Sequence, residues 1–292
     1  MNGVLILNKP AGMTSHDVVH RVRKILQERS VGHLGTLDPM ATGVLPLVLG
    51  RMTRLAQFYT TTDKSYEGEI RFGFATDTYD AEGECVGPQQ EVRIALEDVR
   101  RAAVKFVGTI QQVPPPFSAK KIQGVPAYKL ARKKQEVELK PVEIEVRSFD
   151  ILSAMDDRVR FRAQVSSGTY IRSIAHEIGQ SLGVGAHLSA LKRTAVGEFG
   201  IEQCVTLEQL EAARPEEVER NLCLHARRLL PQFPCVTATD EVAGMIRNGR
   251  AVNLPELSQS KLVKVFRGQS DLIAIVSRVA GTLFHPKIVL PE

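Results

Sequence analysis

Residues 31–46, VGHLGTLDPMATGVLP, place a single carboxylate, Asp38, among glycine, small and apolar residues. Two roles are open to it. An aspartate before proline commonly closes a turn with its own side chain, and the residue before proline is kept out of helical backbone. A carboxylate in apolar surroundings can instead serve an enzyme as a nucleophile. The stretch by itself leaves both interpretations open.

Other catalytic patterns in the chain are weak. HDVVH (16–20) resembles the zinc-binding signature H-E-x-x-H, but Asp17 is a methylene shorter than the usual Glu, and no third ligand stands out. The glycines of 32–43 lack the Lys-Ser/Thr of a phosphate loop, and no G-x-S-x-G elbow is present. No C-x-x-C spacing occurs among the four cysteines. We therefore expect no metal, and a carboxylate is the best candidate nucleophile.

A second unusual segment is SSGTYIRSIAHEIG, residues 166–179, where a strand pattern changes into a helical one. Arg172 falls in the first helical turn, where a cation opposes the helix dipole. An arginine in that place predicts an anion nearby. The alternative is that Arg172 reaches carboxylates on the surface.

Positive charge is concentrated in one part of the chain. The net charge is +5 with a pI of about 9.0, which favours a polyanionic partner only weakly. Residues 120–140 hold seven cations and two acids, with Phe117, Tyr128 and prolines close by. This mixture suits a surface loop that holds a nucleic-acid backbone, although such a run can also be a solvated face.

The elements that must position these residues can be read from hydrophobic periodicity. A short strand at 3–7 precedes a helix that begins with a Thr14–Asp17 capping box. Alternation of apolar and polar residues predicts strands at 66–72, 142–147 and 158–165. Apolar residues at helical spacing then predict helices at 170–182 and near Thr206. We predict an α+β fold around a mixed, mostly antiparallel sheet.

Two domains are expected from the length of 292 residues and from LLPQFP (229–234), which is typical of a linker. We assign residues 1–230 to a catalytic domain and residues 231–292 to a small β-rich domain. The first domain is expected to fold without the second. The N-terminus is typical of a strand rather than a signal peptide, and no apolar run is long enough for a membrane span. We therefore expect a cytoplasmic protein.

Several segments, in order along the chain, resemble the bacterial tRNA pseudouridine synthase B (TruB) family. They are GVLILNKPAGMTSHDVV (3–19), GHLGTLDPMATGVLPL (32–47), DKSYEG (63–68), SGTYIRSIAHEIG (167–179) and GAHLSALKR (185–193), with QQVPPPFSAKKIQGVPAYKLAR (111–132) similar to the RNA-binding insertion, which we place at about 108–140. The C-terminal part resembles a PUA-type RNA-binding domain more loosely. The resemblance implies a synthase that isomerises the T-loop uridine, position 55, of tRNA to pseudouridine.

The resemblance also implies roles for individual residues. Asp38 would be the catalytic aspartate, and Arg172 would hold it ionised and oriented. Tyr66 would stack on the flipped base and supply its hydroxyl for proton chemistry at C5. The residues implied to bind substrate are His33 as a wedge, Tyr170 as a pocket wall, Leu191 as an apolar contact, and Lys9, Lys120, Lys121 and Arg132.

The reaction conserves atoms and oxidises nothing, so no cofactor is expected. The partner implied is the T arm of tRNA. We expect a monomer, with no membrane and no protein partner. The alternative function is a noncatalytic tRNA-binding or folding factor. Such a factor would keep the basic loop and the C-terminal domain but would have no use for Asp38.

Overall fold

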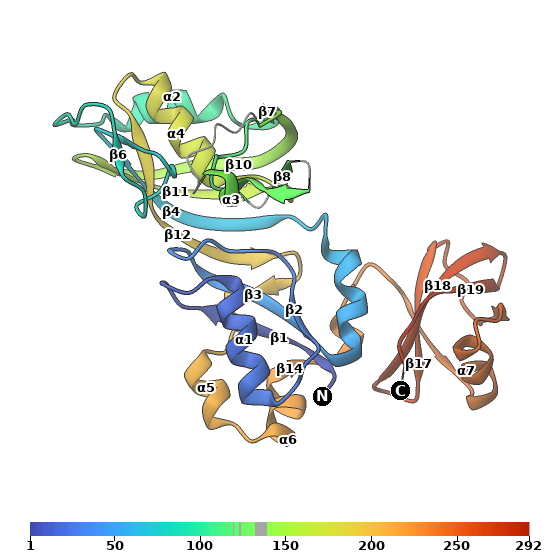
Figure 1. The fold of residues 1–292 in the computed structure, drawn as a ribbon. Coiled ribbons are helices and arrows are strands. Elements are labelled where there is room, and N and C mark those ends of the chain that lie inside the picture. Colours follow the sequence, from blue (N-terminus) through green and yellow to red (C-terminus); the bar gives the residue numbers. More distant parts are fainter. Residues whose placement is uncertain (119, 123, 132–138, 292) are drawn as a thin grey trace.

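One ten-stranded sheet runs through most of the molecule (Figure 1). The computed structural model describes residues 1–118, 120–122, 124–131 and 139–291. The strands lie in the order β14 (Cys223–Leu224), β1 (Gly3–Lys9), β3 (Thr42–Leu49), β12 (Ala186–Val196), β4 (Lys64–Phe72), β11 (Arg158–Val165), β10 (Val142–Met155) and β7 (Gly108–Gln112). Beside this path, β2 (Val31–His33) pairs with β3 and β13 (Phe199–Gly200) pairs with β12. The predicted mixed, mostly antiparallel sheet is confirmed.

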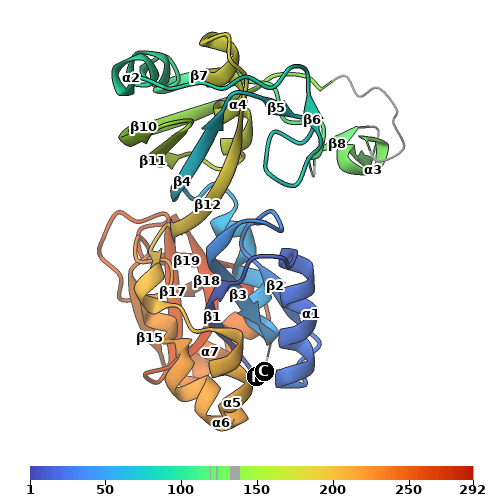
Figure 2. The same ribbon diagram turned by 90° about the vertical axis from the view of Figure 1, so that its left-hand side faces the viewer.

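A short parallel contact between β3 and β12 joins two antiparallel halves of this sheet. Only Lys192 with Thr42 and Arg193 with Gly43 pair there. Gly43 has φ +101°, and a Cβ on it would meet the Arg193 carbonyl oxygen at 2.2 Å. Only glycine fits such a close approach. The halves therefore meet at one point, and Figure 2 shows them as an upper and a lower lobe.

Helices cover each half through apolar faces. α1 (Ser15–Leu26) packs Val18, Val19 and Val22 against β1 and β3, and its predicted capping box is confirmed by reciprocal bonds between Thr14 and Asp17. α2 (Leu96–Val104) and α4 (Ile171–Ser181) cover the other half. No helix within the described ranges is both long and apolar enough to cross a membrane.

Short elements fill the connections. The hairpin β5–β6 (Ala75–Thr76, Cys85–Val86) follows β4, and β8 (Lys121–Ile122), β9 (Val125–Pro126) and α3 (Ala127–Ala131) lie in the insertion. A 3₁₀ helix, η1 (Gly50–Tyr59), follows β3. The remaining short helices are η2 (Ile201–Gln203), α5 (Leu207–Ala212), α6 (Pro215–Glu217), η3 (Val218–Leu222) and η4 (Ala226–Arg228).

The C-terminal part forms its own five-stranded sheet, which confirms the prediction of a small β-rich unit. The order is β15 (Cys235–Ala238), β17 (Leu262–Arg267), β18 (Asp271–Ala280), β19 (Leu283–Val289) and β16 (Val252–Asn253), with α7 (Asp240–Arg247) beside it. In Figure 1 this unit lies next to η1.

The interface between this unit and the large sheet is apolar and continuous. Phe266, Leu272 and Ile275 belong to the same buried cluster as Met52 and Leu55 of η1. Polar contacts surround it: Arg51 forms an ion pair with Asp271, and Arg54 Nη1 donates to the Val289 carbonyl at 2.8 Å. A shared core of this kind argues against the expectation that the first domain folds alone.

Ending the chain at residue 231 should therefore leave a poorly folded protein. The deletion exposes Met52, Leu55 and Tyr59, and each large side chain that loses its packing costs about 2–5 kcal/mol. We expect a much lower melting temperature and binding of a hydrophobic dye, measured by thermal unfolding against the full chain. A truncated protein that unfolds cooperatively near the wild-type temperature would show that the C-terminal unit is dispensable for folding.

Candidate active site

A cavity of about 490 Å³ opens at the junction of the two half-sheets. The loop that connects β2 to β3 forms one wall, and the start of α4 forms another. Six residues predicted for the site line it together: His33, Asp38, Tyr66, Tyr170, Arg172 and Leu191. Segments far apart in the sequence thus converge on one space.

The carboxylate of Asp38 does not close the turn that carries it. That turn is closed by backbone, because the Ala41 amide donates to the Asp38 carbonyl at 3.1 Å. The side chain instead meets Arg172, with Oδ2 2.9 Å from Nε and Oδ1 accepting from Nη2 at 3.2 Å. The turn-capping interpretation therefore does not hold, and the carboxylate is free for an ion pair.

Arg172 is 4% exposed and is surrounded by acceptors. Besides Asp38, its Nη1 donates to the Thr78 carbonyl at 3.0 Å and lies 3.2 Å from Asp80 Oδ2, and its Nη2 donates to the Phe117 carbonyl at 3.1 Å. Two carboxylates, those of Asp38 and Asp80, therefore lie near this helix start, where the sequence predicted an anion. A planar guanidinium held on both edges can present its fork to Asp38 in only one orientation.

Asp80 is the residue of the site that the sequence did not reveal. It is 2% exposed, and its Oδ1 accepts from Thr78 Oγ1 at 2.6 Å and from the Glu82 amide at 3.1 Å. Its sequence context, TDTYDAEG (76–83), is typical of a solvated turn. The only signal was a pair of aspartates in a short polar turn, and the burial of one of them depends on the tertiary fold.

Burial determines the protonation of Asp38. Desolvation raises the pKa of its carboxyl; Arg172 opposes this shift, and the nearby carboxylate of Asp80 adds to it. About 35% of the Asp38 side chain remains exposed, where it faces the cavity. The site therefore holds one guanidinium between two carboxylates, with one of the carboxylates accessible to a ligand.

Lys9 lies behind the loop rather than in the cavity. Its side chain is fully buried, and Nζ donates to three carbonyls, those of Pro10 at 2.8 Å, Pro39 at 3.0 Å and Ala41 at 2.7 Å. An ammonium has three protons, so all of its donors are used. Burial lowers the pKa of Lys9 to about 8. This placement favours positioning of the Asp38 loop over the substrate contact that we expected.

Arg193 holds the same loop from the β12 side. It is fully buried, with Nε donating to the Val44 carbonyl at 2.8 Å, Nη1 to Thr36 at 3.1 Å and Nη2 to Gly35 at 3.0 Å. The sequence marked Arg193 only as part of a family segment. The loop is thus held by two buried cations, which fixes its backbone around Asp38.

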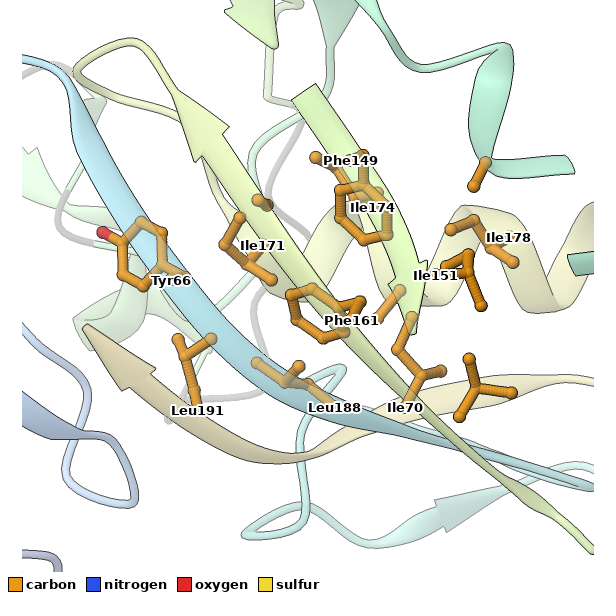
Figure 3. Close-up of a cluster of buried hydrophobic side chains, with 14 of the residues drawn as sticks. Tyr66, Ile70, Phe149, Ile151, Phe161, Ile171, Ile174, Ile178, Leu188 and Leu191 are labelled. Carbon is orange, nitrogen blue, oxygen red and sulfur yellow. The ribbon is translucent and has the colours of Figure 1, made fainter. Parts of the chain in front are cut away.

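Tyr66 and Leu191 form the apolar wall of the cavity. Tyr66 is 7% and Leu191 is 8% exposed, and both belong to the core cluster of β4, β11 and α4. Figure 3 shows Tyr66 at one end of this cluster, with Leu191 beside it and the tyrosine hydroxyl directed away from the apolar side chains. The two residues therefore pack in the core and also border the cavity.

The remaining predicted residues lie at the edge of the cavity or beyond it. His33 Nδ1 accepts from the Gly35 amide at 3.3 Å, and burial together with Arg193 lowers the pKa of this imidazole, which favours its neutral form. Tyr170 precedes α4, where its amide donates to Gln112 Oε1 at 2.8 Å. In the insertion, Lys120 is exposed and Lys121 pairs with Pro126 through backbone. Arg132 lies outside the described residues.

The raised pKa of Asp38 predicts that the ionised carboxylate lowers the free energy of unfolding. Because the folded protein holds the Asp38 proton more tightly than the unfolded chain does, ionising this carboxyl above its folded pKa destabilises the fold. Asp38→Asn should be at least as stable as wild type at neutral pH. The advantage should shrink as the pH falls through the folded pKa and should vanish below about 3.9, the pKa of an unfolded aspartate, where the carboxyl is protonated in both states.

Urea unfolding across this pH range measures the effect. Asp150→Asn, which removes an exposed carboxylate on β10, serves as the matched control and should change the free energy of unfolding little. An Asp38→Asn protein that is less stable than wild type at neutral pH would contradict the prediction.

Known proteins resemble the chain over nearly its whole length. The family model for TruB family pseudouridylate synthase (N terminal domain) matches residues 23–171, and that for the tRNA pseudouridylate synthase B C-terminal domain matches residues 172–231. The tRNA pseudouridine synthase B of Solibacter usitatus is 48% identical, with 99% of this chain and 100% of the relative covered. The protein of the same name from Bacillus anthracis is 40% identical, with 98% and 94% covered.

A chain in the crystal structure of a Cbf5–Nop10–Gar1 complex superposes with a TM-score of 0.71 at 26% identity, covering 99% of this chain and 85% of that one. A chain in an archaeal box H/ACA sRNP Nop10–Cbf5 complex gives a TM-score of 0.70. The first family model spans the Asp38 loop, and the second begins at Arg172. The chain therefore belongs to the TruB family of pseudouridylate synthases.

Proposed function

We propose that this protein isomerises a uridine of tRNA to pseudouridine, with Asp38 as the catalytic carboxylate. The observation that carries the proposal is the Asp38–Arg172 ion pair at the wall of a cavity of about 490 Å³. A space of that size accommodates one nucleoside. The relatives named above support a tRNA substrate.

The reaction exchanges one glycosidic bond for another. The N1–C1′ bond of uridine breaks, the base turns within the site, and a C5–C1′ bond forms; the proton of C5 is lost and N1 gains one. The isomerisation needs no external oxidant or reductant, so a positioned carboxylate near C1′, C2′ and C6 is the central requirement. Asp38 meets it, because Arg172 counteracts the burial that would otherwise favour its protonated form.

The uridine enters the cavity by leaving its stack. A base inside a folded tRNA loop is out of reach of a carboxylate on a cavity wall, so the nucleotide is extruded first. Tyr66 and Leu191 offer an apolar wall for the flipped base. His33, which also borders the cavity, fills the space that the base leaves. The substrate position is the T-loop uridine 55 in the T arm. The enzyme works as a monomer in the cytoplasm.

Replacing Asp38 with Asn tests the proposal most directly. Asn is nearly isosteric but lacks the charge, so Asp38→Asn should fold, bind tRNA with wild-type affinity and form no detectable pseudouridine. Arg172→Lys should retain only part of the rate, because a point charge does not reproduce the planar fork. The measurement is single-turnover release of tritium from C5-labelled uridine in tRNA. Substantial release by a folded Asp38→Asn protein would leave a noncatalytic role for this carboxylate.

Tyr66→Phe separates stacking from proton chemistry. The ring that packs on the base is retained, so tRNA affinity should stay near wild type. The hydroxyl, which points away from the apolar cluster, is lost, so the single-turnover rate should fall by at least about tenfold. Equal rates for Tyr66→Phe and wild type would confine Tyr66 to packing.

The basic insertion is expected to supply affinity rather than chemistry. Changing Lys120, Lys121, Arg132 and Lys133 to Ala should weaken tRNA binding. It should also lower the salt slope by about 0.7–0.9 for each phosphate that the variant no longer neutralises. The rate at saturating enzyme should change much less. Lys105→Ala, at an exposed cation after α2, is the control. An unchanged salt slope would remove the insertion from the tRNA-binding surface.

A further inference from the structure

Two aromatic rings stack next to the buried ion-pair network without lining the cavity. Tyr79, in the turn between β5 and β6, lies on His176 of α4 with ring centroids 3.8 Å apart and an interplanar angle of 12°. Neither residue contributes to the cavity wall. The chemistry proposed above does not use either of them.

Both chain neighbours of Tyr79 contact Arg172. The Thr78 carbonyl accepts from Nη1 at 3.0 Å, and Asp80 Oδ2 lies 3.2 Å from the same nitrogen. On the helix, His176 is four residues after Arg172, so the two side chains lie on one face, a turn apart. The stack therefore joins the turn that holds Nη1 to the helix that carries the guanidinium.

The backbone at Tyr79 is held in an unfavourable conformation. Its φ is +66°, a left-handed value that a bulky residue adopts rarely and at a cost of about 1–3 kcal/mol. Such a conformation persists only where surrounding contacts determine it. Here the Leu188 amide donates to the Tyr79 carbonyl at 3.0 Å, and the ring is held by His176.

Stacking, rather than hydrogen bonding, holds the imidazole. Nδ1 of His176 is buried and has no hydrogen-bond partner among the residues that the structure describes. Burial lowers the pKa of His176, which favours the neutral ring. A neutral imidazole parallel to a phenol ring is an apolar contact whose strength depends on ring overlap.

We propose that Tyr79 and His176 are a positioning pair for the isomerisation. Their stack keeps the Thr78 carbonyl and the Asp80 carboxylate on Nη1 of Arg172, and so fixes the orientation in which the guanidinium meets Asp38. The inference rests on the proposed function, because it assigns the pair an effect on the chemical step. It concerns neither substrate contact nor the affinity for tRNA.

Single-turnover kinetics with full-length protein and tRNA test the pair. His176→Ala removes one ring at a position where Ala suits the helix, and Tyr79→Asn removes the other while keeping a residue that tolerates positive φ. Each should lower the rate roughly three- to tenfold, with the tRNA dissociation constant unchanged. The double variant should be no slower than the slower single variant, because the two changes remove one contact. The single variants Tyr79→Phe and His176→Phe keep a stacked ring and should retain most of the wild-type rate.

Phe74→Leu is the matched control. Phe74 packs on His187 with centroids 4.6 Å apart and lies just before β5, but it does not flank a residue that contacts Arg172. The single-turnover rate of Phe74→Leu should stay near that of wild type. An equal loss in Phe74→Leu would indicate general loosening and overturn the pairing, as would unchanged rates in both ring-removing variants or a loss confined to tRNA affinity.

Hydrogen exchange keeps this test separate from the proposed function. The guanidinium protons of Arg172 should exchange slowly in wild type and in Phe74→Leu, and faster in His176→Ala. If wild type forms no pseudouridine, the proposed function fails, whereas this exchange pattern still reports whether the stack positions Arg172. Equal exchange in wild type and His176→Ala would overturn the positioning role.

Discussion

The ion pair between Asp38 and the buried Arg172 organises the polar groups around the cavity. Asp38 faces a cavity whose walls raise its pKa, and Arg172 is the cation that opposes the shift. A buried guanidinium is itself expensive to desolvate unless its N–H groups find acceptors. Both terminal nitrogens of Arg172 are accordingly engaged, Nη1 by Asp80 and the Thr78 carbonyl and Nη2 by the Phe117 carbonyl.

The same ion pair explains why the Asp38 loop is held from behind. A carboxylate that shifts by an ångström loses both its ion pair and its alignment with a substrate atom. Lys9 and Arg193 donate hydrogen bonds to backbone carbonyls of this loop. Gly43 allows β3 to approach β12 closely, so that Arg193 reaches the loop. Lys9 and Arg193 therefore stabilise the backbone of this loop. The other cations of the chain give it an excess of positive charge, which also suits an RNA partner.

The two structural units are connected through the elements that carry the site. η1 packs on the C-terminal sheet, and its last residue, Tyr59, lines the cavity. The family model for the C-terminal domain ends at residue 231, close to the boundary predicted from LLPQFP, but the apolar cluster continues across it. A proline-bounded segment such as LLPQFP indicates where the first sheet ends. The apolar area that the two sheets bury against each other depends on how they pack, which the local sequence does not show.

The α+β class, the Thr14–Asp17 capping box and the alternating strands could be predicted from the sequence, because periodicity and capping are local. The pairing of Asp38 with Arg172 came only from the resemblance to a family, because the two residues are distant in sequence. Which polar groups are buried depends instead on tertiary packing. The local sequence around Asp80 is typical of a solvated turn, Tyr79 falls in the same turn, and Lys9 was expected to contact substrate. Packing against α4 and the loop from β2 to β3 instead gives each of them a partner distant in sequence. The free energy of a buried charge depends on neighbours that only the fold brings together.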